Sequence, residues 1–250
     1  LYAACFRAME EISEQIGKDG SVYRAEYEKL TAVIEKFFWD EEKGAYIDSF
    51  TSGRRNVTRH ANIFAILFSV ADEKKQEKIL KNVLENDEIP AITTPYFNFF
   101  ELDVLCRMGK LTEVLDKIRS YWGGMLDFGA VTFWEEYDPS VPKEEQYDMY
   151  GDHFGKSLCH AWAASPIYFL AKYFAGLDLV NKDGVTYILK PQMQYFTELD
   201  CTLPVGSNGV VRLVWDGEIL EITPNADGGI LELGEQKLSL VRGETRRVKI

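Results

Sequence analysis

The stretch SLCHAWAASPIYFLAKYFAGL, residues 157–177, separates two kinds of pattern in this chain of 250 residues. Up to Gly176, apolar residues recur at spacings of three and four, which is typical of amphipathic helices. Beyond Gly176 the runs are short, rich in β-branched residues and bounded by Gly, Pro, Asn and Asp, which is typical of strands. We therefore expect a helical part that ends in a long helix over residues 155–175, followed by an all-β part.

The helical part is predicted to contain about seven helices. Residues 24–38 show the pattern clearly, because Tyr27, Leu30 and Ile34 fall on one face. The other helices are expected near residues 1–16, 57–71, 72–85, 95–108, 111–122 and 155–175, the last but one ending before a pair of glycines. Long apolar helices alternate with amphipathic ones, as expected when an inner and an outer ring of helices pair in a barrel.

The runs after Gly176 predict a small antiparallel β-sandwich. They are VTYILKP, FTELDCTLPV, GVVRLVWDG, EILEITP, GILELG and QKLSLV. Their acidic residues alternate with apolar ones, so we assign these residues to the solvent face of half-buried strands rather than to a catalytic site. Trp215 could contact a glycan, although a single strand tryptophan more often packs against a neighbouring sheet.

The segments VTFWEEYDPS, residues 131–140, and SLCHAWAASPIYFL contain the kinds of side chain that sugar cleavage needs. The transition state resembles an oxocarbenium ion, so one carboxylate must activate water or attack carbon while another protonates the departing oxygen. Glu135 or Glu136 can supply one carboxylate. Trp134 offers a flat apolar face for a sugar ring, and His160 and Trp162 can donate hydrogen bonds to its hydroxyls.

Each of these residues also has a purely structural interpretation. Adjacent glutamates at the start of a helix often serve only as caps or as solvated charges near the positive end of the helix dipole. His160, on a predicted apolar helix, could be a hydrogen-bonded core histidine. The residue types and their spacing leave both interpretations open.

TFWEEY followed by SLCHAWAASPIYFLAKYFAGL is very similar to the end of the catalytic domain of bacterial α-L-rhamnosidases. The resemblance implies that residues 1–175 form the C-terminal portion of an (α/α)6 catalytic barrel and that residues 176–250 form a C-terminal β-sandwich domain. It also implies that Glu135 is the general base and that His160 contacts the sugar. Because the acid of the motif is doubled, Glu136 is the fallback for the base.

Two further stretches resemble barrel helices of the same family, RHANIFAILFSVAD at residues 59–72 and TTPYFNFFELDVLCRMGK at residues 93–110. In such barrels the inner helices expose polar and aromatic groups to the cleft. The cleft candidates in these stretches are His60, Asn62, Tyr96, Asn98 and Glu101. The alternative is that they fill a core, as aromatic residues at helical spacing usually do.

The resemblance implies an inverting α-L-rhamnosidase that releases terminal L-rhamnose and needs no metal or organic cofactor. The family's general acid comes from a motif far upstream of TFWE, and no segment of this chain matches that motif. The opening helix lacks a convincing N-cap, so we expect a fragment of a larger enzyme, inactive by itself, whose partner is the N-terminal remainder of the polypeptide. The alternatives are a six-hairpin glycosidase with another sugar specificity, or a noncatalytic glycan-binding or structural protein.

Composition limits the partners of the chain. A formal net charge of −12 argues against nucleic-acid binding, which needs clustered Lys and Arg, whereas a neutral carbohydrate is compatible with it. No stretch approaches the roughly 20 apolar residues that cross a bilayer. Leu1 does not begin a signal-peptide pattern, so the compartment, whether cytoplasmic, periplasmic or extracellular, stays open.

The four cysteines, Cys5, Cys106, Cys159 and Cys201, are widely spaced and lie mostly in apolar surroundings. They form no CxxC pair, and no histidine lies at zinc-site spacing from them. We therefore expect buried free thiols and neither a disulfide framework nor a structural metal.

Overall fold

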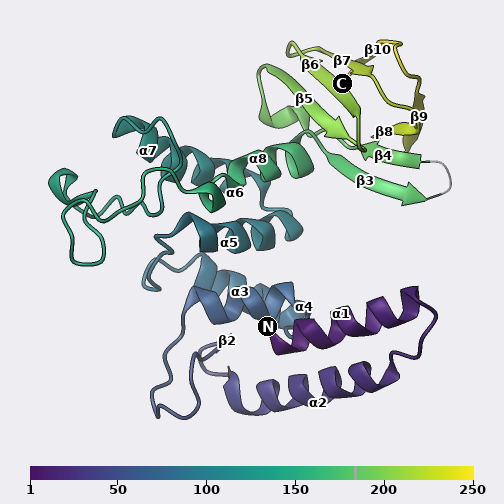
Figure 1. Cartoon of the computed structure of the whole chain (residues 1–250). Helices are drawn as coiled ribbons and strands as arrows, with labels where there is room; N and C mark the ends of the chain where they lie inside the picture. The colour runs from purple at the N-terminus through teal and green to yellow at the C-terminus, as the bar shows by residue number, and fades with distance from the viewer. Residues whose placement is uncertain (183–184) are drawn as a thin grey trace. The chain divides into compact units, whose positions relative to one another are not determined.

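The computed structural model describes residues 1–182 and 185–250, whose helices and strands are labelled in Figure 1. The chain divides into two compact units. The first consists of Leu1–Met108 with Trp134–Ser157, and the second of Gly109–Phe133 with Leu158–Ile250. The first unit is helical with two short strands, and the second combines further helices with two sheets.

The first unit opens with a helical hairpin of α1 (Tyr2–Gln15) and α2 (Ser21–Phe38), seen at the purple end of the chain in Figure 1. Gly20 lies in the connection, and a Cβ there would come within 2.9 Å of the main-chain oxygen of Glu10. The two helices can approach this closely because glycine has no side chain. Arg24 of α2 pairs with Glu10 of α1 across the hairpin.

After α2 the chain makes a small antiparallel ladder of β1 (Trp39–Asp40) and β2 (Ala45–Tyr46). Asn62, a fully buried residue of α3 (Arg59–Leu67), connects this ladder to the helix. Its side-chain oxygen accepts the Tyr46 N–H at 2.8 Å, and its side-chain nitrogen donates to the Tyr46 carbonyl at 2.9 Å. This asparagine therefore satisfies backbone groups that burial would otherwise leave without partners.

The fourth helix, α4 (Glu73–Ile79), begins at a side-chain cap and ends in a wider turn. The Asp72 carboxylate accepts the Lys75 N–H at 2.9 Å, which satisfies one of the free donors of the first turn. The helix continues without a break into the π-helical turn Leu80–Leu84. The predicted charged helix over residues 72–85 is thus present.

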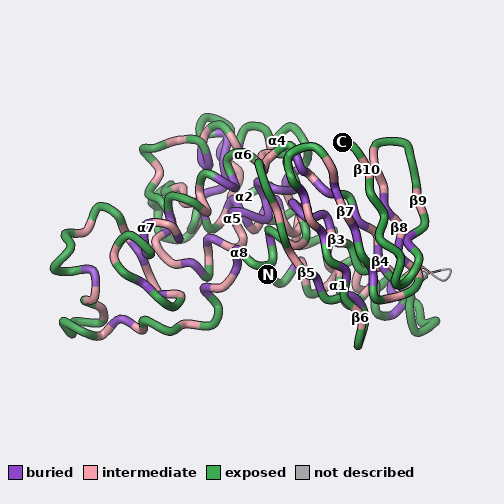
Figure 2. Tube along the Cα trace, turned by 90° about the horizontal axis from the view of Figure 1, so that it is seen from above, coloured by how far each residue is buried: buried purple, intermediate pink, exposed green. Residues whose placement is uncertain are grey.

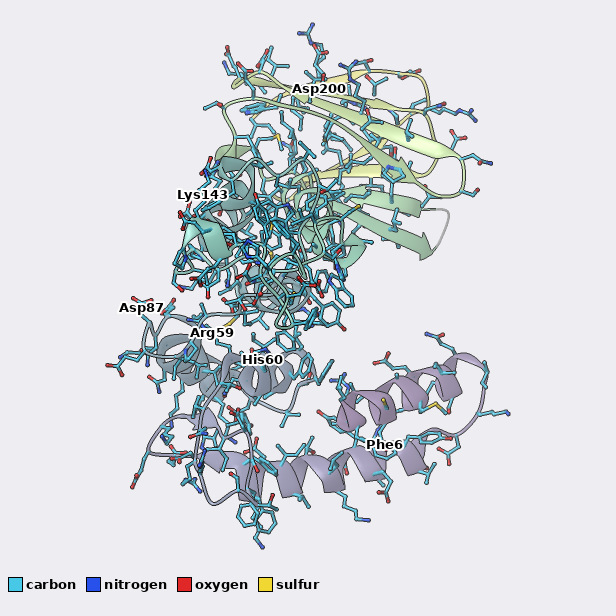
Figure 3. All side chains as sticks on the ribbon, turned by 60° about the vertical axis from the view of Figure 1, so that its left-hand side comes forward. Phe6, Arg59, His60, Asp87, Lys143 and Asp200 are labelled. Carbon is cyan, nitrogen blue, oxygen red and sulfur yellow. The ribbon has the colours of Figure 1, made fainter. Side chains whose placement is uncertain are left out.

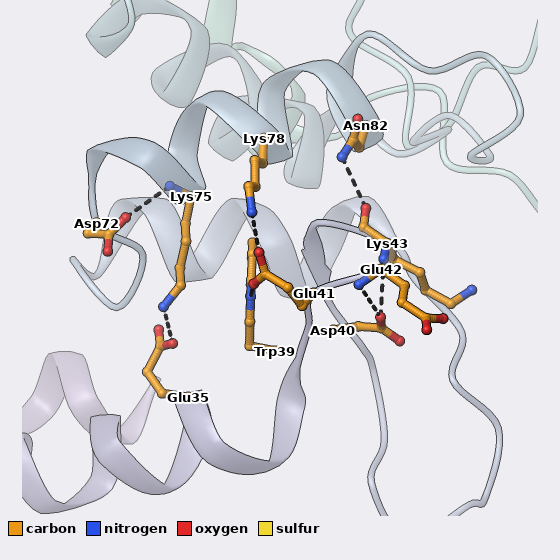
Figure 4. Close-up of polar contacts among 10 residues, drawn as sticks. All are labelled: Glu35, Trp39, Asp40, Glu41, Glu42, Lys43, Asp72, Lys75, Lys78 and Asn82. Carbon is orange, nitrogen blue, oxygen red and sulfur yellow. Dashed lines mark hydrogen bonds and ion pairs between the residues drawn. The ribbon is translucent and has the colours of Figure 1, made fainter.

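Charged side chains of α4 contact the end of α2 and the segment that follows it (Figure 4). Lys75 pairs with Glu35, and Lys78 pairs with Glu41. Both ammonium groups also lie over the Trp39 ring, at 5.1 and 5.8 Å from its centroid. Cation–π contacts and ion pairs therefore act together to fix α4 against this connection.

The helix α5 (Pro95–Arg107) packs against α3 through aromatic rings. Pro95 occupies the first turn, where a missing N–H leaves no intrahelical bond unmade. Phe64 of α3 lies with its ring centroid 5.0 Å from Phe97 and 5.3 Å from Phe100. Aromatic side chains of α3 and α5 thus form the contact between these two helices.

In the second unit, α6 (Leu111–Lys117), the π-helical turn Ile118–Trp122 and α7 (Gly123–Asp127) follow one another without interruption. The sequence-based prediction that this helix ends before the glycine pair is therefore wrong. Glycine weakens a helix by only about 1 kcal/mol. Burial of the side chains of Trp122 and Met125 on either side of the pair offsets that cost.

The predicted helix over residues 155–175 is also only half correct. Its second half forms α8 (Ser165–Phe169) and the π-helical turn Leu170–Phe174. Its first half is not helical apart from the single 3-10 turn Ala161–Ala163. Pro166 lies in the first turn of α8, where its missing N–H leaves no intrahelical bond unmade.

In the described part of the second unit, eight strands form two four-stranded sheets. Their bounds are β3 (Leu177–Lys182), β4 (Val185–Leu189), β5 (Leu199–Val205), β6 (Gly209–Trp215), β7 (Ile219–Pro224), β8 (Gly229–Leu233), β9 (Gln236–Leu240) and β10 (Arg246–Lys249). One sheet has the order β10-β7-β6-β5 and is wholly antiparallel. The other has the order β3-β4-β8-β9, and its central pair, β4 and β8, is parallel.

The strands bury alternate residues, as the changing colours along them show (Figure 2). On β6 the buried residues are Val211, Leu213 and Trp215, and all three belong to one apolar cluster with residues of the other sheet. The Trp215 indole donates to the Phe196 carbonyl at 3.0 Å. This tryptophan is therefore a core residue, in agreement with the structural interpretation of it.

The described part of the chain contains seven continuous helical segments besides isolated 3-10 turns, because α7 continues α6. This number agrees with the prediction of about seven helices. The change from helix to strand falls between Phe174 and Leu177. A domain boundary between residues 175 and 176 stays a prediction. None of the helices in residues 1–182 and 185–250 is long and apolar enough to cross a membrane.

Candidate active site

Glu135 lies in an irregular segment and is fixed by a reciprocal pair of hydrogen bonds to Ser157. The Glu135 N–H donates to the Ser157 carbonyl at 2.9 Å, and the Ser157 N–H donates to Glu135 Oε2 at 3.1 Å. The Tyr150 hydroxyl donates to the other carboxylate oxygen, Oε1, at 2.7 Å. Donors on both oxygens fix the plane of the carboxylate.

Glu136 has different partners from its neighbour. Its Oε1 accepts the Thr93 hydroxyl at 2.8 Å, and the next residue, Tyr137, donates its N–H to the Thr93 carbonyl at 3.1 Å. Neither Glu135 nor Glu136 lies at the start of a helix. The interpretation of the two glutamates as helix caps is therefore wrong, and their two carboxylates are held by separate parts of the first unit.

Trp134 is buried, with only 3% of its surface exposed. Its ring packs edge-to-face on Tyr147 at a centroid distance of 5.7 Å. The expectation that Trp134 offers a face to a sugar is corrected on this point, because a buried indole in a packed interior has no room for a ligand. Its burial instead anchors the residue directly before Glu135.

The loop between Glu136 and Ser157 is organised by a buried amide. The Gln146 side chain, fully buried, donates to the carbonyls of Asp138 and Val141 at 2.7 and 2.8 Å. Further along, Met149 and Asp152 form a tight turn with two main-chain hydrogen bonds of 3.0 Å. The loop is therefore internally bonded on both sides of Tyr147.

Lys156 supplies a cation to this carboxylate-rich region. It is only 8% exposed, and burial lowers the pKa of its ammonium group. The nearby carboxylates act in the opposite direction on that pKa, in the order Glu136, Asp138, Asp148 and Glu135. The two glutamates therefore share this part of the first unit with a buried cation.

His160 belongs to the second unit and precedes the helix instead of lying on it. It has an extended backbone conformation, and its N–H donates to the Phe133 carbonyl at 2.8 Å. Its ring is half-buried and lies 4.2 Å from that of Trp162, which is 52% exposed. The alternative of a core histidine on an apolar helix is thus wrong, whereas contact of His160 with a sugar stays a prediction. An imidazole and an indole lie together at the surface of this unit.

The other substrate-binding candidates lie in the first unit, and both are exposed. The His60 ring on α3 lies 4.1 Å from Phe97, and the Tyr96 ring on α5 lies edge-to-face on Phe100 at 5.7 Å. Figure 3 shows His60 beside Arg59 on the same helix. Glu135 is in this unit too, whereas His160 and Trp162 are in the other.

Three further polar candidates on these helices are internal. Asn62 binds the backbone of β2, and the Asn98 amide donates to the carbonyls of Ile92 and Thr94 at 3.0 and 3.2 Å. Glu101 forms a buried ion pair with Arg59 at 3.1 Å. These three residues stabilise the fold in this structure, in agreement with the alternative that such residues fill a core.

Sequence reasoning did not identify Tyr150, Lys156 or Arg59. Gly151 carries a weak signal, because glycine is common at the second central position of a two-residue hairpin turn. Nothing in the sequence around Lys156 or Arg59 indicates burial, since lysine and arginine are usually exposed.

The free cysteines differ in how far they are buried. Cys5 and Cys159 are exposed and Cys106 is buried, so the prediction of buried thiols holds for only some of them. Burial raises the pKa of the Cys106 thiol to about 12. Residues 1–182 and 185–250 contain no group of three or more His, Cys, Asp or Glu side chains placed to hold a metal ion.

Comparison with known proteins identifies the family of the helical part. The sequence model of the bacterial alpha-L-rhamnosidase six-hairpin glycosidase domain matches residues 1–174. The chain belongs to this family. Its six-hairpin glycosidase domain ends where the last helix ends, and the strands of the second unit follow. The predicted resemblance is thereby confirmed, and the domain is that of a glycoside hydrolase.

Solved structures agree with this family. A rhamnosidase from Klebsiella oxytoca with rhamnose bound is 28% identical over 68% of this chain and 32% of its own, with a TM-score of 0.60. A GH78 family rhamnosidase of Bacillus sp. GL1 is 25% identical over 93% of this chain and 25% of its own, with a TM-score of 0.75. A Streptomyces avermitilis alpha-L-rhamnosidase complexed with L-rhamnose, 15% identical, has a TM-score of 0.65 over 92% of this chain and 22% of its own, and supports the fold.

The six-hairpin glycosidase chain spans between 22% and 32% of the length of these structures. A search among curated proteins found none that matches it.

Proposed function

We propose that this six-hairpin domain belongs to an inverting α-L-rhamnosidase and that Glu135 is its general base. The observation that carries the proposal is the Glu135 carboxylate, which is oriented by the Ser157 N–H and the Tyr150 hydroxyl within the TFWE segment. A general base must be ionised and correctly oriented before water arrives. Donors to both of its oxygens favour both conditions.

In the proposed reaction Glu135 removes a proton from a water molecule on one face of the sugar ring. The water oxygen forms a bond to the anomeric carbon while the bond from that carbon to the glycosidic oxygen breaks. A second carboxyl group gives its proton to that oxygen, so the products are L-rhamnose of inverted anomeric configuration and a free alcohol. Inversion requires roughly 6.5–9.5 Å between the two carboxyl groups, which leaves room for the water.

We assign the general acid to a part of the protein outside these 250 residues. The coverage of the solved rhamnosidases supports this, because they extend well beyond the region that the chain matches. The other acids near the candidate helices already have structural roles, since Glu136 binds Thr93 and Glu101 is buried with Arg59. The N-terminal remainder of the polypeptide is thus the proposed partner.

The proposed substrate is a rhamnose-containing glycan or glycoside. Among the candidates for sugar contact, His60 and Tyr96 are exposed in the first unit, and Trp162 is exposed beside His160 in the second. Aromatic faces with neighbouring hydrogen-bond donors suit the apolar and hydroxyl-bearing sides of a sugar. The acidic net charge is compatible with a neutral sugar.

The test is Glu135→Gln in the native protein, with hydrolysis of an aryl α-L-rhamnoside as the assay. Glutamine keeps the size of the side chain but cannot accept the proton, so we expect kcat to fall by about 10²–10⁴-fold while ground-state binding of rhamnose is retained. Glu136→Gln is the matched control and is expected to keep most of the activity.

Three outcomes would contradict parts of the proposal. Unchanged turnover in Glu135→Gln would remove Glu135 as the base, and loss confined to Glu136→Gln would transfer that role. Proton NMR of the first-formed sugar would disprove inversion if the anomeric configuration were retained. A panel of aryl glycosides on which another sugar is cleaved faster would replace the rhamnoside assignment.

A further inference from the structure

Tyr150 lies at the tip of the tight turn between Met149 and Asp152. These two residues exchange main-chain hydrogen bonds of 3.0 Å in both directions. The two residues between them both have positive φ, 56° at Tyr150 and 80° at Gly151. Positive φ at both central positions is the signature of a type I′ turn.

Tyrosine is an unfavourable choice at the first central position of this turn. Asn, Asp and Gly are preferred there, because an ordinary side chain is strained at positive φ. Ser69 is the only other non-glycine residue with positive φ in the described part of the chain. A bulky residue in such a conformation persists only when the surrounding contacts hold it there, and residues held in this way are concentrated at functional sites.

Burial does not explain the choice of tyrosine. The residue is 80% exposed, so its ring contributes little to a packed core. The contact that distinguishes it is the 2.7 Å hydrogen bond from its hydroxyl to Oε1 of Glu135. Asparagine or glycine would suit the turn better but could not reach that oxygen.

The surrounding loop holds the turn in place. Gly155 lies so close to the Met149 carbonyl that a Cβ there would come within 2.1 Å of its oxygen. The Lys156 N–H donates to the Tyr147 carbonyl at 3.2 Å, and the Tyr147 ring stacks on Phe154. The strained turn is therefore supported from its base.

We propose that Tyr150 is a positioning residue for the general base, held by the strained turn so that its hydroxyl orients the Glu135 carboxylate. This inference rests on the proposed function of Glu135. The Ser157 N–H on Oε2 and the Tyr150 hydroxyl on Oε1 together stop rotation of the carboxylate about its last side-chain bond. Orientation of the base before the reaction contributes to rate without changing substrate affinity.

The contact has an electrostatic consequence in each direction. The Glu135 carboxylate raises the pKa of the Tyr150 hydroxyl, chiefly through this hydrogen bond. In return, a donor to a carboxylate favours its ionised form, so removal of the hydroxyl disfavours that form. The base would then stay protonated up to a higher pH, and the acid limb of the kcat/KM profile would move upward.

The first experiment compares three variants of the native protein on an aryl α-L-rhamnoside. Tyr150→Phe keeps the ring and removes the hydroxyl, so we expect kcat to fall about three- to tenfold, with KM nearly unchanged and the acid limb at higher pH. Tyr150→Asn suits the turn, so we expect equal or higher thermal stability together with a similar loss of kcat. Tyr2→Phe, at a tyrosine that is 77% exposed, is the control with wild-type kinetics.

Two results would overturn the inference. Wild-type kcat and acid limb in Tyr150→Phe would show that the hydroxyl does not act through Glu135. Full activity in Tyr150→Asn would show that only the turn geometry matters.

The second experiment needs no turnover and separates this inference from the proposed function. Carbon-13 NMR of labelled tyrosine ring carbons follows the titration of Tyr150, which the Tyr150→Phe spectrum assigns. Glu135→Gln is expected to lower the pKa of Tyr150 towards the ordinary value, because the carboxylate that raises it is gone. An unchanged Tyr150 titration would disprove the contact. If the titration responds but Glu135→Gln remains active, the proposed base is wrong and the positioning role falls with it.

Discussion

Glu135 and Glu136 are adjacent in the sequence, yet different contacts hold their carboxylates. Glu135 accepts a main-chain N–H and a tyrosine hydroxyl from the loop before Ser157, whereas Glu136 accepts the hydroxyl of Thr93. Residue type cannot separate two glutamates in a row. Their hydrogen-bond partners do separate them, and they favour Glu135 as the group that could act on water.

Arg59 and Glu101 form a buried ion pair that carries a prediction at the residue scale. Arg59 also donates to the Leu84 carbonyl at 2.8 Å. Arg59→Met removes the cation beside a buried carboxylate, so we expect the free energy of unfolding to fall by about 3–5 kcal/mol. Urea unfolding followed by circular dichroism measures the change.

The matched control for this prediction is Arg212→Met. Arg212 pairs with Asp200 at 2.7 Å, but both side chains are largely exposed. Solvent screens such a pair, so the control should unfold at nearly the wild-type urea concentration. If Arg59→Met were as stable as this control, the buried pair would have no net stabilising role.

At the scale of elements, helix ends depend on packing as well as on local preference. The glycine pair at 123–124 predicted a helix end, but α7 continues from Gly123 to Asp127 because neighbouring side chains are buried. The helix predicted over residues 155–175, in contrast, begins only at Ser165, with Pro166 in its first turn. His160 therefore lies outside that helix, in an extended conformation with its N–H on the Phe133 carbonyl.

Gly123→Ala should stabilise the continuous helix formed by α6, the π-helical turn and α7. A Cβ at this position would meet no atom within 4 Å, and the residue already has helical angles. We expect the free energy of unfolding to rise by up to about 1 kcal/mol. The increase in melting temperature relative to the wild type measures this stabilisation.

Gly206→Ala is the control with the opposite expected sign. A Cβ at Gly206 would also meet no atom within 4 Å, but φ there is 65°. Alanine is strained at positive φ, so this variant should melt below the wild type. Equal effects of the two substitutions would contradict the conformational explanation.

At the scale of the whole molecule, charge limits what the protein binds. The net charge of −12 repels phosphate backbones at long range. We expect no retention on duplex DNA at about 50 mM salt, where charge-driven binding is strong. Retention on an anion exchanger under the same conditions is the control, and binding to the DNA would reveal a basic surface that overrides the net charge.

Much of this protein follows from its sequence alone. Spacings of three and four predicted the helices, and short alternating runs predicted the strands, because these periods come from backbone geometry that is the same in every protein. TFWEEY and CHAW indicated the family, and the resemblance made two adjacent glutamates the candidates for the general base. These signals are local, so they can be read without knowing which segments meet.

The tertiary structure decided what depends on distant residues. It buried Trp134 on Tyr147, exposed Trp162, placed Tyr150 on Glu135 and showed β4 and β8 to be parallel. Each of these outcomes depends on which segments pack together and on which polar groups lose water. Burial and hydrogen bonding are properties of that packing, and residue order alone does not determine them.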